Sequence, residues 1–171
     1  MQIDLDNHDL ALQLAAMGWK VFPCNPDKSP ATLHGYLDAT HDIQQIESWW
    51  GKNPRSLVGL ACAPSGLWVL DLDRHAGQPD GVAAYTDLVN QHGEQTVEVG
   101  PTQTTPGNGW HLVFKAPRLP ADFKMPGKLI PGIDIRFDGY ICTGALPDGR
   151  SYQWQPGHEF YTPLTYPPAW I

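Results

Sequence analysis

An apolar run that carries two acids constrains the fold of this chain more than any other feature. The sequence LWVLDLD over residues 67–73 predicts a strand whose alternation places Asp71 and Asp73 on one face. Their Cα atoms would lie about 6.6 Å apart, so the carboxylates could reach one hard cation or share a pair of cations. Bound Mg²⁺ or Mn²⁺ is the usual relief for two such charges at the end of a buried strand. In a plainer interpretation the strand ends at Asp71 and water solvates both acids.

A glycine-rich turn leads into a second predicted strand with a histidine near its start. In PGNGWHLVF, residues 106–114, alternation separates His111 from the large apolar side chains of the same strand. Glycines let the backbone approach a ligand closely, and an imidazole can hydrogen-bond a phosphate. The turn is neither a Walker A loop nor a complete dinucleotide fingerprint. A purely structural role for His111 remains the alternative.

A third acid stands between two isoleucines. In IDIR, residues 133–136, Asp134 and Arg136 share the face opposite to the isoleucines. Burial of an acid in a strand is costly unless the acid is paired, and Arg136 is the local partner. The functional interpretation makes Asp134 a third metal ligand instead.

The rest of the pattern predicts a single α+β domain spanning residues 1–171. Helical spacing, caps and glycine stops indicate helices at 8–17, from Thr40 or Asp42 to 50, and at 81–91. Short apolar runs between turns indicate strands at 19–23, 57–62, 67–73, 96–100, 110–115, 133–137 and 140–143. A Pro-Ser-Gly turn favours a hairpin of 57–62 with 67–73. The second helix is expected to bury Ile43, Ile46, Trp49 and Trp50, and residues 25–39 and those from 152 onward are expected to be irregular.

The charge balance excludes a domain coated in Lys and Arg, which is the simplest nucleic-acid binder. The formal net charge is −7, so any contact with nucleic acid must be local, weak and salt-sensitive. Three cysteines without CxxC spacing argue against a disulfide framework and a structural zinc site. No apolar run is long enough to span a membrane, and we expect a cytoplasmic protein with no membrane contact.

In their order, the three motifs resemble the active-site motifs of the archaeo-eukaryotic primase superfamily. DLD at 71–73, GWH at 109–111 and IDIR at 133–136 are similar to those of the bifunctional DNA primase/polymerase (prim-pol) N-terminal domain of plasmid and phage replication proteins. The stretches GWKVFP at 18–23 and PAW at 168–170 also fall in the family's order. The resemblance therefore spans nearly the whole chain.

The resemblance implies a fold and an activity. The fold is archaeo-eukaryotic primase-like: a small α/β module joined to an RNA-recognition-like sheet module, with the active site in the cleft between them. The activity is the joining of dNTP or rNTP on a single-stranded DNA template, with a helicase domain or protein as a possible partner.

The resemblance also implies residue roles. The catalytic set would be Asp71, Asp73, His111 and Asp134, in which the three acids hold Mg²⁺ or Mn²⁺ and His111 contacts the triphosphate. Further nucleotide contacts are expected from Lys28, Gly109 and Arg136. Gly109 stands where the family often has a serine, so a hydroxyl contact is lost there. The resemblance assigns no DNA-binding residues.

Two other functions stay open. Nucleotide-sugar glycosyltransferases also use DxD at a strand end to hold Mn²⁺ on a diphosphate. A degenerate replication module would bind DNA without chemistry, although the intact set of Asp71, Asp73, His111 and Asp134 argues against it. The sequence contains no helicase, whether or not it is part of a larger replication protein, and we expect primer extension with weak or absent de novo priming.

Overall fold

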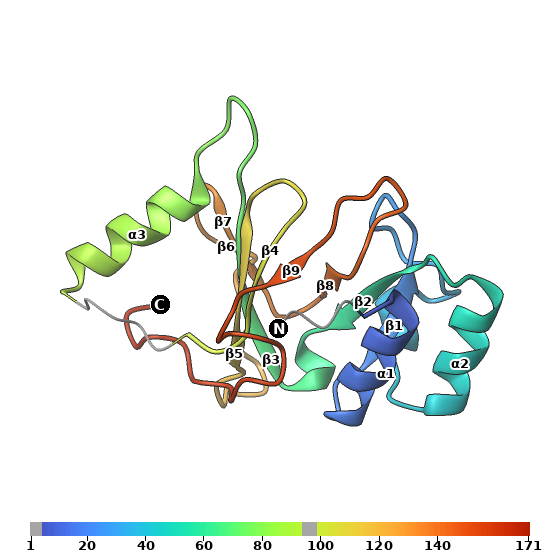
Figure 1. Cartoon of the computed structure of the whole chain (residues 1–171). Coiled ribbons are helices and arrows are strands. Elements are labelled where there is room, and N and C mark those ends of the chain that lie inside the picture. The colour runs from blue at the N-terminus through green and yellow to red at the C-terminus, as the bar shows by residue number, and fades with distance from the viewer. Residues whose placement is uncertain (1–4, 94–98) are drawn as a thin grey trace. The chain divides into compact units, whose positions relative to one another are not determined.

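The computed structural model describes residues 5–93 and 99–171 as a mixed α/β protein with few helices and antiparallel sheets (Figure 1). The chain forms two compact units. The first contains residues up to 66 and residues 139–153, and the second contains residues 67–138 and 154–171. No helix in the described ranges is long and apolar enough to cross a bilayer.

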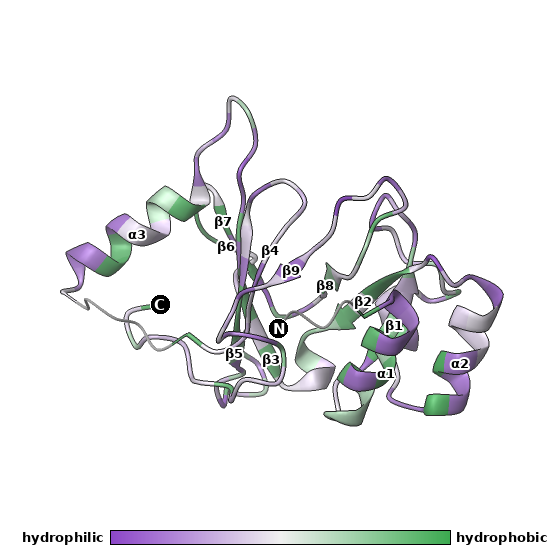
Figure 2. Cartoon of the chain, in the orientation of Figure 1, coloured by the Kyte–Doolittle hydropathy of each residue, from purple (hydrophilic) through white to green (hydrophobic). Residues whose placement is uncertain are grey.

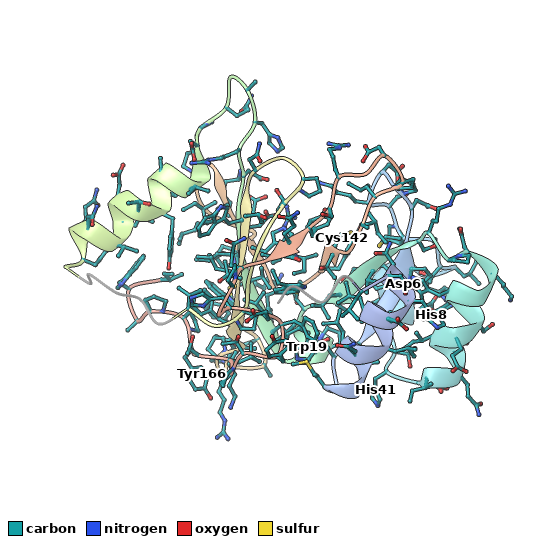
Figure 3. All side chains as sticks on the ribbon, viewed as in Figure 1. Asp6, His8, Trp19, His41, Cys142 and Tyr166 are labelled. Atoms are coloured by element: carbon teal, nitrogen blue, oxygen red, sulfur yellow. The ribbon has the colours of Figure 1, made fainter. Side chains whose placement is uncertain are left out.

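The first unit contains a three-stranded antiparallel sheet with the strand order β1-β2-β8. Its elements are α1 (Asn7–Ala16), β1 (Val21–Cys24), the 3₁₀ helix η1 (Gly35–Asp38), α2 (Ile43–Lys52), β2 (Leu57–Ala61), the 3₁₀ helix η2 (Ala63–Ser65) and β8 (Tyr140–Thr143). Both α-helices begin with an aspartate cap, which was predicted for α2 but not for α1. Asp6, labelled in Figure 3, accepts a hydrogen bond from the N–H of Asp9, and Asp42 accepts one from the N–H of Gln44.

The second unit is built on a six-stranded sheet with the order β6-β7-β3-β5-β4-β9. Its elements are β3 (Leu67–Leu72), α3 (Gly81–Gln91), β4 (Thr102–Thr104), β5 (Trp110–Lys115), β6 (Lys128–Ile130), β7 (Ile133–Arg136) and β9 (Gln153–Trp154), the last of which lies at the sequence boundary between the units. β3 lies in the middle and pairs antiparallel with both β5 and β7.

One face of the larger sheet is apolar. It carries the buried cluster Trp68, Leu70, Leu72, Leu112, Phe114, Ile133 and Ile135. Side chains of α3, including Tyr85 and Leu88, pack against this cluster, and Figure 2 shows apolar green segments on α3 beside polar purple ones. Because side chains alternate along a strand, the residues between these apolar ones share the other face of the sheet. The sequence prediction of these faces is confirmed.

The expected hairpin of 57–62 with 67–73 is wrong. β2 pairs with β1 and β8, whereas β3 pairs with β5 and β7 in the other sheet. Residues Ala63–Ser65 form η2, and Gly66 follows it with a left-handed φ of 68°. Alternation fixes the face of a strand but not its partner, because every half-buried strand has the same period.

Other differences are smaller. Ile43 is 54% exposed, although its helical position predicted burial, whereas Ile46 and Trp50 are buried as expected. β4, β6 and β9 contain only two or three residues each and give no sequence signal of their own. The short helix η1 lies in a stretch expected to be irregular. Most of the predicted strand 96–100 lies outside the described residues.

A close approach of two glycines binds the start of α3 to the end of β3. The N–H of Gly81 donates to the carbonyl of Asp73 at 2.8 Å, and the N–H of Asp73 donates to the carbonyl of Gly132 at 2.9 Å. A Cβ on Gly81 would clash with the carbonyl oxygen of Gly132. These backbone contacts hold Asp73 in place just beyond β3.

Gly81→Ala should therefore destabilise the protein by about 1–3 kcal/mol, because its Cβ meets rigid backbone rather than a flexible side chain. Gly127→Ala is the matched control, since a Cβ there meets no atom within 4 Å. Denaturant unfolding of both variants checks this expectation. Equal stabilities would show that the contact between the two glycines is not restrictive.

Candidate active site

Five polar residues form a row across five neighbouring strands of the larger sheet. Gln103 pairs with His111, His111 with Asp71, Asp71 with Asp134, and Asp134 with Lys128. Direct cross-strand partners point to the same side of a sheet, so the five side chains share the face opposite to the apolar cluster. The register thus brings together residues that are far apart in the sequence.

Polar contacts join neighbouring residues at both ends of the row. Gln103 Nε2 lies 2.8 Å from His111 Nδ1, and His111 Nε2 lies 3.3 Å from Asp71 Oδ1. At the other end, Lys128 Nζ lies 3.1 Å from Asp134 Oδ1. The remaining gap, between Asp71 and Asp134, separates two carboxylates.

Arg136 fills the gap between the two carboxylates. It shares a face with Asp134 because it lies two residues further along β7. Its Nε donates to Asp71 Oδ2 at 3.1 Å, and its Nη2 donates to Asp134 Oδ2 at 3.1 Å. The guanidinium therefore supplies the positive charge that two neighbouring acids require.

The carboxyl group of Asp71 is ionised despite its burial. Burial alone would raise its pKa, but the hydrogen bond and charge of His111, together with Arg136, hold the pKa below its usual range. The plain interpretation, in which Asp71 ends the strand in water, is wrong, because Asp71 lies within β3 and its side chain is only 12% exposed.

Asp73 has a different environment. It follows the last residue of β3, and its side chain is 38% exposed, with Oδ1 lying 3.5 Å from His75 Nε2. Partial burial, followed by the negative charge of Asp71, raises its pKa. His75 opposes this rise, and the remaining effects of Asp134, which raises the pKa, and of Arg136, which lowers it, are smaller. Asp71 and Asp134 thus both act electrostatically on Asp73 within this unit.

The donor chemistry fits a hard divalent cation. Asp134 Oδ1 is buried and accepts no hydrogen bond from the described residues, although Lys128 lies beside it without hydrogen-bond geometry. Carboxylate oxygens on adjacent strands are ligands that Mg²⁺ and Mn²⁺ prefer. Within the described ranges, however, no three His, Cys, Asp or Glu side chains are already arranged around a common metal position. A metal at this site thus stays a prediction.

The other predicted nucleotide contacts lie outside the row. A Cβ on Gly109 would lie 2.5 Å from the carbonyl oxygen of Leu72, and the Gly109 N–H donates to Thr105 Oγ1 at 3.0 Å. The close packing of the turn before β5 therefore explains why a glycine stands at position 109. Lys28 belongs to the first unit, where it has a left-handed φ of 72° and its carbonyl accepts a hydrogen bond from the Tyr140 hydroxyl.

Gln103 is the site residue that sequence reasoning missed. The strand β4 is too short to be predicted, so its pairing with β5 stayed hidden. The turn residues PGNG at 106–109 are the signal that the sequence offers, and in the structure the Thr105 N–H donates to the Gly109 carbonyl at 2.8 Å and closes a hairpin. Counting outward from that closure places Gln103 opposite His111.

The fold and the site together define a class: a sheet-based domain with a cluster of interacting acids, a histidine and an arginine on one face. Residues 11–170 match the family model of Prim-Pol, the bifunctional DNA primase/polymerase N-terminal domain. The match covers nearly the whole chain, so the chain belongs to this family. No curated protein matches the sequence significantly.

Removal of the central guanidinium should leave two neighbouring carboxylates without compensation. We expect Arg136→Gln to lower the free energy of unfolding by about 1–2 kcal/mol in the presence of a chelator. This is less than for a fully buried pair, because the Arg136 side chain is 41% exposed. Added Mn²⁺ should restore part of the loss.

Denaturant unfolding with and without Mn²⁺ is the measurement, and Arg150→Gln is the control. Arg150 pairs with Asp148 on the surface, with both side chains more than half exposed. A loss for Arg136→Gln no larger than that for Arg150→Gln would contradict a compensating role for Arg136.

Proposed function

We propose that this chain is the catalytic domain of a template-dependent nucleotidyltransferase, a DNA primase/polymerase of a plasmid- or phage-type replication protein, which works by two-metal phosphoryl transfer. The observation that carries the proposal is the register that sets His111, Asp71 and Asp134 side by side. Membership of the Prim-Pol family implies primase/polymerase activity in DNA replication and favours nucleotidyl transfer over nucleotide-sugar transfer. The retained acids and histidine favour an active enzyme over a degenerate module.

The three acids would hold the divalent cations, Mg²⁺ or Mn²⁺. When bound, such cations lower the pKa of a 3′-hydroxyl and neutralise the leaving pyrophosphate. Asp71 supplies a carboxylate that is already ionised. Asp134 supplies a buried oxygen to which no described residue donates a hydrogen bond. Asp73 lies near enough for both other acids to raise its pKa.

The remaining site residues would bind the nucleotide. His111 would donate a hydrogen bond to a phosphate oxygen, since an imidazole N–H suits that acceptor. Arg136 presents a partly exposed guanidinium, whose fork matches phosphate geometry. Lys28 and Gly109 stay proposed contacts, through an ammonium group and through close approach of the backbone respectively.

The DNA partner would be a single-stranded template held by local contacts. The net charge of −7 leaves little long-range attraction for DNA, so binding should weaken steeply with salt. We further propose that the two units correspond to the α/β and RNA-recognition-like modules of the primase architecture. A helicase domain or protein would supply the unwound template.

Asp71→Asn should abolish incorporation, with a loss of at least about 100-fold, because it removes a central ligand charge. The assay measures extension of an annealed primer with Mg²⁺ or Mn²⁺. Asp87→Asn, on the exposed surface of α3, is the matched control and should extend normally. Full activity of Asp71→Asn would remove the basis of the proposed site.

Primer extension should be efficient, whereas de novo priming should be weak or absent. Priming must hold two nucleotides and a template at once, but extension starts from a partner that is already paired, so fewer groups have to be ordered. A chain with a net charge of −7 is poorly equipped for the harder task. Labelled nucleotide incorporation at low salt, on primed and unprimed templates, distinguishes the two. Efficient priming by this chain alone would contradict the expectation.

A further inference from the structure

Gln103 is a fully buried amide with no part in the proposed chemistry. It lies in β4 with no exposed side-chain surface, and its Nε2 is 2.8 Å from His111 Nδ1. An apolar side chain of similar size would occupy this position without the cost of burying an amide. The direct contact between Gln103 and His111 offers an explanation for an amide at this end of the polar row.

The neighbours of His111 determine which of its nitrogens carries the proton. The other ring nitrogen, Nε2, lies 3.3 Å from Asp71 Oδ1. An ionised carboxylate only accepts hydrogen bonds, so His111 Nε2 must carry a hydrogen. In a neutral imidazole Nδ1 is then an acceptor, and the amide of Gln103 must donate to it.

We propose that Gln103 is a positioning residue, which holds the neutral imidazole of His111 as the Nε2–H tautomer. That hydrogen is directed at Asp71 in the absence of nucleotide, and it would pass to a phosphate oxygen of the incoming triphosphate when Asp71 binds a cation instead. Only the part of this inference that concerns the triphosphate rests on the proposed function. Second partners of this kind commonly fix the tautomer and the ring orientation of functional histidines. Here the partner comes from the neighbouring strand in direct register.

The neighbouring residue on β4 provides a control. Thr102 is also buried, but alternation directs it to the opposite face, and its Oγ1 donates to the carbonyl of Gly100 at 3.2 Å. Thr102→Val keeps the shape of the side chain and removes a buried hydrogen bond outside the polar row. An effect that comes only from lost stability should therefore appear in both Thr102→Val and Gln103→Met.

The first experiment measures the imidazole ¹⁵N resonances of His111 at pH 8.5, without nucleotide or metal, and assigns them by their absence in His111→Ala. The wild type should show Nε2–H, with Nδ1 shifted by an accepted hydrogen bond. Gln103→Met should move Nδ1 toward the value of a free acceptor, whereas Thr102→Val should leave it unchanged. An Nδ1–H tautomer in the wild type would overturn the proposal even if no variant folds.

The second experiment measures primer extension against nucleotide concentration. Gln103→Met should raise KM for the nucleotide about ten-fold and change kcat less, because the donor is still present but no longer held. His111→Ala should show at least as large an effect, and Thr102→Val none. Unchanged His111 resonances, or an unchanged KM, in Gln103→Met would overturn the proposal. A wild type that shows the expected tautomer but no incorporation would instead contradict the proposed function.

Discussion

The charge of Asp71 is the constraint on which the second unit depends. Its carboxylate lies on the central strand of a six-stranded sheet, where burial penalises an ionised group. The charge is compatible with that position because His111 and Arg136 contact the two oxygens separately. Arg136 belongs to β7 and His111 to β5, the two strands that flank β3. The strand order β7-β3-β5 therefore places one compensating partner on each side of Asp71.

Local sequence rules predict the faces of this sheet well. Alternation separates the acids and His111 from the apolar cluster, and the caps Asp42 and Asp80 mark where α2 and α3 begin. The same rules fail at long range, as the wrong hairpin of β2 with β3 shows. The partner of a strand depends on which apolar faces pack together. Those faces come from segments far apart in the sequence, so the residues of a single turn do not determine the pairing.

The sequence indicates the members of the candidate site but not their contacts. DLD, GWH and IDIR identify Asp71, His111 and Asp134 as candidates, while only the register shows that they are direct neighbours. Gln103 escaped because a three-residue strand carries too little periodicity to be recognised. Arg136 was expected to pair with Asp134, and the structure adds that it contacts Asp71 as well.

The polar row is better explained by function than by stability. Buried ion pairs rarely stabilise a fold more than well-packed apolar residues of similar volume would. The opposite face of the same strands is entirely apolar at its centre, so the sheet has a packed core without the row. A continuous line of amide, imidazole, carboxylates and ammonium, with the pKa values of two acids shifted in opposite directions, is costly to assemble. Such groups are characteristic of sites that bind charge or transfer it, which is the role proposed for this face.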